Sequence, residues 1–316
     1  MSKLFQIKDL KKQFSKEGRS LYALSDIQLD IHEGETLGLV GESGCGKSTL
    51  GKLLLKLIEP TSGQISFEGE NLLQFEGEEL KNFRRKVSVV FQDPYASLNP
   101  RMTVEDIVAE PLEIHQLFTA SERKERVKQL LELVGLSTDQ LARFPHEFSG
   151  GQRQRIGIAR ALSINPKFLI CDEPISALDV SIQAQIINLL KALQQEMGLT
   201  YLFIAHDLRV VKYISTRVAV MYLGHIVELA DSEELYAKPL HPYTQALFSA
   251  IPSIARKQEP RQTRILLQGE IPSAFDVPKG CPFASRCPHA QKICHEVKPE
   301  WKEVNVGHFA SCHLIP

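Results

Sequence analysis

The chain has 316 residues, and its 37 Lys and Arg almost balance its 38 Asp and Glu, for a formal net charge of −1 at pH 7. This balance excludes the broad basic field that attracts nucleic-acid phosphates, so we expect no general nucleic-acid binder. With 43% hydrophobic and 24% charged residues, the chain can bury a core and falls outside the disordered and fibrous classes. Its length allows one large domain or two smaller ones.

Signals for membrane insertion or export are not readable in the sequence. The apolar run 218–223 falls far short of the roughly 18 to 20 residues that cross a bilayer. Lys3, Lys8 and Asp9 interrupt what would have to be the apolar core of a secretory signal, so we expect a cytosolic chain. In that reducing compartment, the six cysteines are poor disulfide candidates.

Residues 3–230 alternate short apolar runs with amphipathic helical patterns. Runs rich in Val, Ile and Leu that are separated by helical periods predict an α/β fold around a largely parallel sheet. The expected strands, in chain order, cover residues 35–40, 64–68, 87–91, 168–171, 200–205 and 217–221.

The segment 95–147 differs from its surroundings because its patterns are helical. Helices are expected over residues 104–114 and 121–134. The second helix is expected to open at Ser121, although Lys124 stands where a capping box would have Glu. We interpret the segment as a helical insertion in the α/β core.

The strongest motif directly follows the strand expected at residues 35–40. Residues 41–49 read GESGCGKST, which fits the G-x4-G-K-S/T phosphate loop, and residues 50–58 continue as a helical pattern. Glycines let backbone N–H groups turn toward phosphate oxygens, and the helix N-terminus adds positive potential. Lys47 is expected to reach the β- and γ-phosphates, and Ser48 to ligate Mg²⁺. The residues expected to contact the nucleotide here are Gly41, Ser43, Gly44, Cys45, Gly46, Lys47, Ser48 and Thr49.

Two acids follow the apolar run 168–171. Asp172 and Glu173 are therefore expected at the C-terminal end of a buried strand, where the ligands of open α/β sheets collect. Asp172 can hold Mg²⁺ through water, and Glu173 can accept a proton from an attacking water. An acidic pair at a strand end can also be solvated surface or a helix cap. The pair therefore indicates a nucleotide site only in combination with the phosphate loop.

A second glycine-containing motif, Phe148 followed by Ser149, Gly150, Gly151 and Gln152, lies upstream of the acidic strand. With it the chain resembles the ATP-binding subunits of ABC transporters, whose signature is Ser-Gly-Gly-Gln. In that family the signature of one cassette closes on the nucleotide that the other cassette holds. Taken alone, the tetrapeptide can also be a plain helix N-cap.

The resemblance implies roles for five further residues. Gln92 resembles the Q-loop glutamine, which touches Mg²⁺ or the attacking water, and Asp179 resembles the D-loop aspartate, which acts across the dimer. His206 resembles the switch histidine that contacts the γ-phosphate. Phe14 matches the usual position of the adenine-stacking aromatic residue, and Tyr22 is its competitor.

The implied reaction is hydrolysis of the γ-phosphate of ATP. Glu173 polarises the water and His206 holds the geometry, while Lys47 and Mg²⁺ neutralise charge on the phosphoryl oxygens. Gln92 belongs to the same catalytic set, and Ser48, Gln92 and Asp172 are the expected ligands of Mg²⁺.

Segments 91–101, 240–247 and 280–287 resemble the oligopeptide/dipeptide importer branch of the family. This implies an ATPase that powers import of di- or oligopeptides from the cytoplasmic face of the inner membrane. The implied partners are two transmembrane permease subunits, a second ATP-binding subunit in a heterodimer or homodimer, and indirectly a solute-binding protein, with no nucleic acid. The alternatives are an importer of nickel or another small solute, and a soluble ABC ATPase of DNA repair or ribosomes.

The resemblance divides the chain at about residue 240. Residues 1–240 are expected to be the nucleotide-binding domain, with a RecA-like core, an antiparallel β edge and the helical subdomain at 95–147. Residues 241–316 are expected to be a small peptide-permease-type extension, with the linker marked by the Pro-containing segments 251–253 and 258–261. The apolar content of the extension is thin, so a metal would help to hold it.

The extension contains four of the six cysteines, in the spacing C-x5-C-x6-C-x17-C: Cys281, Cys287, Cys294 and Cys312. This spacing matches neither zinc C-x2-C pairs nor the standard ferredoxin patterns. Resemblance to the peptide-permease extension implies a [4Fe–4S] cluster, with Zn²⁺ as the alternative and disulfides or free thiols as the non-metal reading. Nearby histidines that could replace a ligand are His289, His295, His308 and His313. Cys45 and Cys171 are expected to be small packing residues.

Overall fold

The computed structural model describes residues 2–16, 19–251, 265–270, 272–273, 275 and 278–315. The chain folds into two compact units. The first unit comprises Met1–His32, Thr36–Leu73 and His206–Pro316, and the second comprises Glu33–Glu35 and Gln74–Ala205. Nearly all of the expected linker lies outside the described residues, and the domain boundary at 240 stays a prediction.

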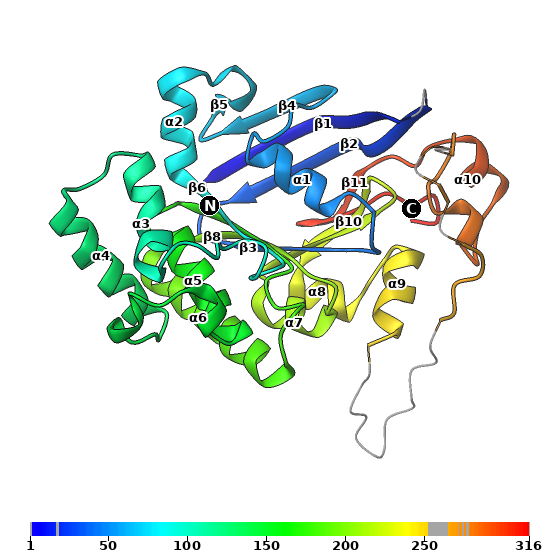
Figure 1. Ribbon diagram of the computed structural model, residues 1–316. Helices are drawn as coiled ribbons and strands as arrows, with labels where there is room; N and C mark the ends of the chain where they lie inside the picture. The colour runs from blue at the N-terminus through cyan, green and yellow to red at the C-terminus, as the bar shows by residue number, and fades with distance from the viewer. Residues whose placement is uncertain are drawn as a thin grey trace, which may run out of the picture. The chain divides into compact units, whose positions relative to one another are not determined.

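An antiparallel sheet forms one part of the first unit (Figure 1). Its order is β2-β1-β4-β5, with β1 at Lys3–Lys16, β2 at Arg19–His32, β4 at Ser62–Phe67 and β5 at Glu70–Asn71. Apolar side chains of β1 and β2, including Phe5 and Ile31, are fully buried, which fixes the register of the pair. This sheet is the antiparallel edge that the resemblance implies.

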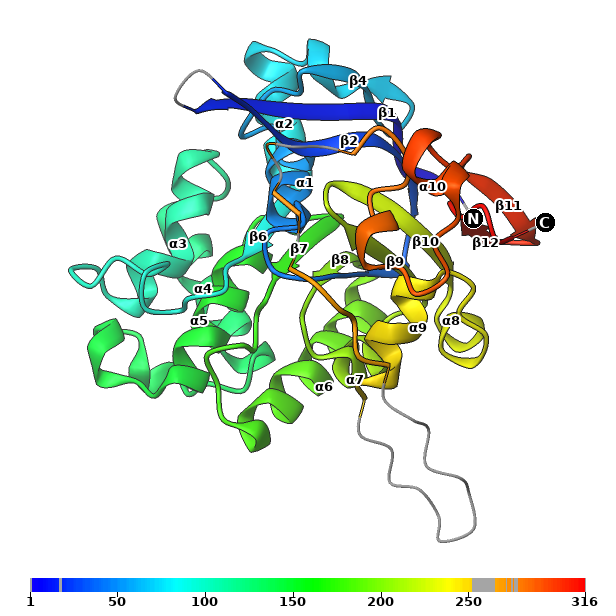
Figure 2. The ribbon, with the colours of Figure 1, turned by 90° about the vertical axis from the view of Figure 1, so that its right-hand side faces the viewer.

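The strands of a second, mixed sheet in this unit follow the order β11-β12-β10-β9-β3. β3 at Thr36–Val40 pairs in parallel with β9 at Arg217–Tyr222, and β10 at His225–Asp231 returns antiparallel to β9. β11 at Lys302–Asn305 and β12 at His308–Ala310 add two antiparallel strands beside β10 (Figure 2). The C-terminal extension therefore continues a sheet that begins at the phosphate loop's own strand.

The helices of the first unit are short and lie around these strands. They are α1 at Lys47–Leu54, α7 at Leu208–Ile214, α8 at Ser232–Ala237, α9 at Pro242–Ser249 and α10 at Lys292–Glu296. Because α1 directly follows β3 across the phosphate loop, the strand–loop–helix context expected from the sequence is present.

The second unit contains three parallel strands in the order β8-β7-β6. β6 spans Val87–Val90, β7 spans Phe168–Asp172 and β8 spans Thr200–Ile204. Its helices are α2 at Gly77–Lys86, α3 at Val104–Ile114, α4 at Ala120–Leu133, α5 at Gly150–Leu162 and α6 at Val180–Met197. The helical segment expected between the strands is thus present, with α3, α4 and α5 packed on one another.

One local expectation about this helical segment is wrong. Helix α4 is capped by Thr119 and not by Ser121, since the Thr119 hydroxyl accepts from the backbone N–H of Glu122. The Glu122 carboxylate in turn accepts from the Thr119 N–H at 2.7 Å, which completes a capping box. Ser121 lies in the first turn, where it has no capping role. In the described ranges, none of the helices combines the length and hydropathy of a bilayer-spanning segment.

Candidate nucleotide site

The phosphate loop in the first unit connects β3 to α1 and depends on glycine at two positions. A Cβ at Gly41 would lie 2.1 Å from the Met221 carbonyl oxygen, so no side chain fits there. Gly46, the N-cap of α1, has φ +110°, and a Cβ there would lie 2.5 Å from the Ala23 oxygen. The close approach of backbone to backbone therefore sets the shape of the loop.

Lys47 is the first residue of α1 and is 7% exposed. Its ammonium group donates hydrogen bonds to the carbonyl oxygens of Gly41 at 2.8 Å and Glu42 at 3.0 Å. The loop thus holds its lysine in place through its own backbone. A lysine fixed in this way places positive charge at the helix N-terminus, where phosphate binds.

The two cysteines outside the extension are buried and have free thiols. Cys45 is a residue of the phosphate loop and is 5% exposed, and burial raises the pKa of its thiol above the ordinary value. Burial, and then the charge of Asp172, raise the pKa of Cys171 on β7. Protonated, enclosed thiols of this kind act as small packing groups.

Glu42 of the phosphate loop is held by two residues that the sequence analysis did not single out. Its backbone N–H donates to the Tyr243 hydroxyl at 3.0 Å, and its carboxylate accepts two hydrogen bonds from Arg286 at 2.8 and 3.1 Å. The segments 240–247 and 280–287 resembled the peptide-importer branch, but no local pattern pointed to this contact.

The second unit brings together two of the expected catalytic residues. The Gln92 side-chain amide, just after β6, donates to the Glu173 carboxylate at 2.8 Å. Glu173 follows Asp172, the last residue of β7, and its backbone has φ +48°. A non-glycine residue in this left-handed region is uncommon and costs energy, so it persists only where the surrounding structure fixes it.

The Ser-Gly-Gly-Gln motif begins helix α5, as the sequence predicts. Ser149 is the N-cap, its hydroxyl accepts from the Gln152 N–H, and the Gln152 side chain accepts from the Ser149 N–H at 3.0 Å. A Cβ at Gly151 would lie 2.5 Å from Ile182 of α6, so close helix packing requires this glycine. The capping role is thus present, and the contact with nucleotide stays a prediction.

The remaining expected residues lie at element ends and on the antiparallel sheet. Asp179 is the N-cap of α6 without a side-chain capping bond. His206 begins the last segment of the first unit and lines a shallow hollow with Leu247 of α9. Phe14 on β1 is 38% exposed, and the Lys12 ammonium lies 4.9 Å from its ring centre.

Tyr22, the alternative adenine-stacking residue, pairs with Gln13 across the β1–β2 ladder. Phe14 pairs with Leu21 on the same ladder, one position along. The structure leaves both rings partly accessible, so the choice between them stays a prediction.

The four cysteines of the extension are all free thiols: Cys281, Cys287, Cys294 and Cys312. A backbone hydrogen bond joins two of them, since the Cys281 N–H donates to the Cys294 oxygen at 2.7 Å. Burial, and then the charges of the other three thiols, raise the pKa of Cys281 to about 11. Within the described ranges, however, no three His, Cys, Asp or Glu side chains converge as they must to hold a metal ion.

Comparison with known proteins now identifies the chain's relatives. Residues 24–176 match the ABC transporter family, and residues 227–294 match the C-terminal region of oligopeptide/dipeptide transporters. The oligopeptide transport ATP-binding protein OppF of Bacillus subtilis is 54% identical over 98% of this chain and 96% of its own. The chain belongs to the ATP-binding subunits of ABC transporters. AppF of the same organism, also an oligopeptide transport ATP-binding protein, is 51% identical over 98% of this chain and 97% of its own.

Solved structures support the same assignment. The dimeric ATP-binding cassette MJ0796, in a post-hydrolysis state bound to ADP and Pi, superposes with a TM-score of 0.66 at 31% identity, covering 72% of this chain and 98% of its own. These comparisons confirm that the chain belongs to the oligopeptide branch. They also confirm the ABC cassette fold and the class of ATP-hydrolysing transport subunits.

Proposed function

We propose that this chain is the ATP-hydrolysing subunit of a membrane complex that imports di- or oligopeptides. The observation that carries this proposal is the match of residues 227–294 to the oligopeptide/dipeptide transporter C-terminal region, in a chain that also has the phosphate loop, the acidic strand and the signature. The chain would bind two transmembrane permease subunits at the cytoplasmic face of the inner membrane. A solute-binding protein would deliver the peptide to those subunits.

Each expected residue has a defined task in hydrolysis. The phosphate loop binds the phosphates of ATP through backbone N–H groups, and Lys47 neutralises charge at the β- and γ-phosphates. Ser48, Gln92 and Asp172 are the residues that would hold Mg²⁺, which would supply Lewis-acid charge stabilisation. Glu173 accepts a proton from the attacking water, and its hydrogen bond to Gln92 at 2.8 Å orients the carboxylate.

A second cassette completes the proposed site. Ser149 and the glycines that follow it lie at the N-terminus of α5, where a hydroxyl and backbone N–H groups can bind phosphate of the partner's nucleotide. Asp179 acts across the same dimer, and His206 contacts the γ-phosphate. Phe14 stacks on adenine, with Tyr22 as the alternative. The partner is a second ATP-binding subunit or a second copy of this chain.

The nucleotide assignment is tested by Lys47→Ala with Lys52→Ala as the matched control, because Lys52 is an exposed lysine of the same helix. Loss of a charge-assisted phosphate contact worth about 3 kcal/mol should weaken ATP binding roughly 100-fold. Equilibrium titration with a fluorescent ATP analogue measures this. Equal affinity of the two variants would contradict the assignment.

The transport assignment is tested by reconstituting the complex in vesicles. ATP-driven uptake of labelled di- and oligopeptides is the expected result. Uptake of Ni²⁺ with no response to peptide would instead favour the small-solute alternative, and binding to ribosomes or DNA without permease subunits would contradict an importer.

For the extension we propose that its four thiols bind a [4Fe–4S] cluster, with Zn²⁺ as the alternative ligand. Four free thiols in one short extension, and the backbone hydrogen bond that joins Cys281 to Cys294, support this proposal. Because no convergent ligand set is present in the described residues, metal binding must draw the thiols together.

Anaerobic purification followed by iron, sulfide and zinc analysis tests this proposal. About four iron and four sulfide per chain are expected, and Cys287→Ser should lose them while Cys171→Ala keeps them. Zinc without iron would support the alternative, and absence of all three would contradict a metal site.

A further inference from the structure

The cysteine loop, which we define as residues 280–287, reaches the phosphate loop through one side chain. The side chain of Arg286 is 8% exposed, and its two terminal nitrogens donate to the two carboxylate oxygens of Glu42 at 2.8 and 3.1 Å. Such a bidentate pair fixes both direction and distance, which a single-contact lysine pair does not. The two residues are 244 positions apart in the sequence.

An aromatic cluster holds the cysteine loop where this contact forms. Phe283 is fully buried, and its ring centre lies 5.2 Å from that of Tyr222 and 5.4 Å from that of Tyr243. The same two tyrosines reach the pair, since the Tyr243 hydroxyl accepts from the Glu42 N–H and the Tyr222 hydroxyl contacts Arg286 at 3.4 Å. Glu42 is therefore held through both its backbone and its side chain.

The contact continues into the nucleotide-binding group. The carbonyl oxygen of Glu42 accepts a hydrogen bond from the Lys47 ammonium at 3.0 Å. A shift of Glu42 thus moves an acceptor that holds the phosphate-binding lysine. Without Arg286, moreover, the Glu42 carboxylate would stand uncompensated in a loop that receives a polyanion, and like charges in a partly buried site repel.

We propose that Arg286 is a positioning residue of the nucleotide site, which neutralises and anchors Glu42 and so couples the cysteine loop to the phosphate loop. The inference rests on the proposed function, because it requires that the phosphate loop bind ATP. It assigns to the C-terminal extension a direct part in nucleotide affinity.

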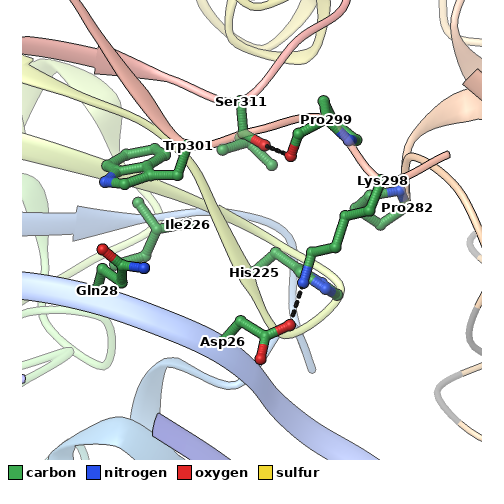
Figure 3. A pocket seen from close by; sticks show the side chains of 10 residues that line it. Asp26, Gln28, His225, Ile226, Pro282, Lys298, Pro299, Trp301 and Ser311 are labelled. Carbon is green, nitrogen blue, oxygen red and sulfur yellow. Dashed lines mark hydrogen bonds and ion pairs between the residues drawn. The ribbon is translucent and has the colours of Figure 1, made fainter. Parts of the chain in front are cut away.

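A second ionic contact of the extension offers a matched control. Lys298 pairs with Asp26 on β2 at the rim of a pocket that also contains His225 and Trp301 (Figure 3). The side chains of Lys298 and Asp26 are 39% and 38% exposed, and neither touches the phosphate loop in the contacts described. Exposed pairs of this kind contribute little.

The test measures ATP affinity and steady-state hydrolysis of the reconstituted complex for Arg286→Ala, Glu42→Gln/Arg286→Ala and Lys298→Ala. Arg286→Ala should weaken ATP binding and raise KM roughly tenfold while kcat changes less than about twofold, because the hold of the loop on phosphate weakens while Glu173 and Gln92 are unchanged. The double variant should recover most of the affinity, because it removes the unpaired charge. Lys298→Ala should match wild type.

The separate readouts of KM and kcat distinguish positioning from mere stability, since a smaller folded fraction lowers the apparent kcat and leaves KM unchanged. Arg286→Gln provides a second variant of similar size if Arg286→Ala does not fold, with the same tenfold expectation. Wild-type affinity in Arg286→Ala or Arg286→Gln, or a double variant no better than Arg286→Ala, would overturn the inference. Failure of wild type to bind ATP, or of Lys47→Ala to weaken binding, would instead overturn the proposed function.

Discussion

The phosphate loop and the cysteine segment 281–312 are both expected ligand sites, yet they are built in opposite ways. In the phosphate loop, close backbone packing at Gly41 and two carbonyl contacts to Lys47 set the shape. In the cysteine segment, the four thiols are free, and no metal-holding group of three is found among the residues that the structure describes. The shape of the phosphate loop is set by the backbone of the chain itself, whereas we propose that the cysteine site is completed only by its ligand.

Gly41→Ala should break the preformed loop and give the largest effect on stability. The added Cβ would meet the Met221 carbonyl oxygen at 2.1 Å, and backbone cannot yield as a side chain can. We expect a loss of about 4 kcal/mol in the free energy of unfolding, measured by denaturant titration. Gly69→Ala is the control, because Gly69 also has positive φ but open space around it, and it should cost only about 1 kcal/mol. Equal losses would contradict a sterically set loop.

His308→Gln should lower the stability of strand β12, which lies next to Cys312 at the end of the cysteine segment. His308 on β12 is fully buried between Glu228 at 2.8 Å and Glu234 at 3.0 Å. Burial alone would lower its pKa, but hydrogen bonds to these carboxylates and their charges outweigh burial and raise it. Breaking a buried ionic pair should cost about 3 kcal/mol at pH 6.

The stability that His308 contributes should fall as pH rises. Because the folded pKa of His308 is raised, its contribution is fully present below the unfolded pKa of about 6.5 and is lost as pH rises through the folded value. Thermal unfolding of wild type and His308→Gln at several pH values should therefore converge toward alkaline pH. A difference that grows with pH would contradict a protonated His308.

Lys298→Ala should give the smallest effect. The pair with Asp26 is more than a third exposed on both sides, and Lys11 also contacts Asp26 at 2.8 Å. We expect a change of less than about 1 kcal/mol, reduced further by salt. A larger loss in denaturant titration would show that the extension depends on surface charge and not on β12 and the aromatic cluster.

The sequence predicts much of the core because burial leaves a local pattern. Helix α3 at Val104–Ile114 matches its expected range. Strand β7 at Phe168–Asp172 is one residue longer than the strand expected at 168–171. The expected strands begin only at residue 35, however, whereas β1 and β2 occupy the preceding chain. Register shifts along this pair, as between Ile7 and Leu10, interrupt the alternation that would reveal it.

The site residues divide in the same way. Lys47 and Ser149 belong to motifs whose strand, loop and helix are contiguous in the sequence, so their local placement could be predicted. The pairing of Arg286 with Glu42 and the strands β11 and β12 depend on contacts between distant segments. Short polar strands and single long-range ion pairs leave no periodic signal, so only the folded chain reveals them.

The central claim, that this chain hydrolyses ATP through Glu173, is tested most directly by single-turnover hydrolysis in the reconstituted complex with Glu173→Gln. The amide keeps the shape of the side chain but cannot accept the water's proton. Glu173→Gln should bind ATP like wild type and hydrolyse it at least about 100-fold more slowly. Near-wild-type hydrolysis by this variant would contradict the account.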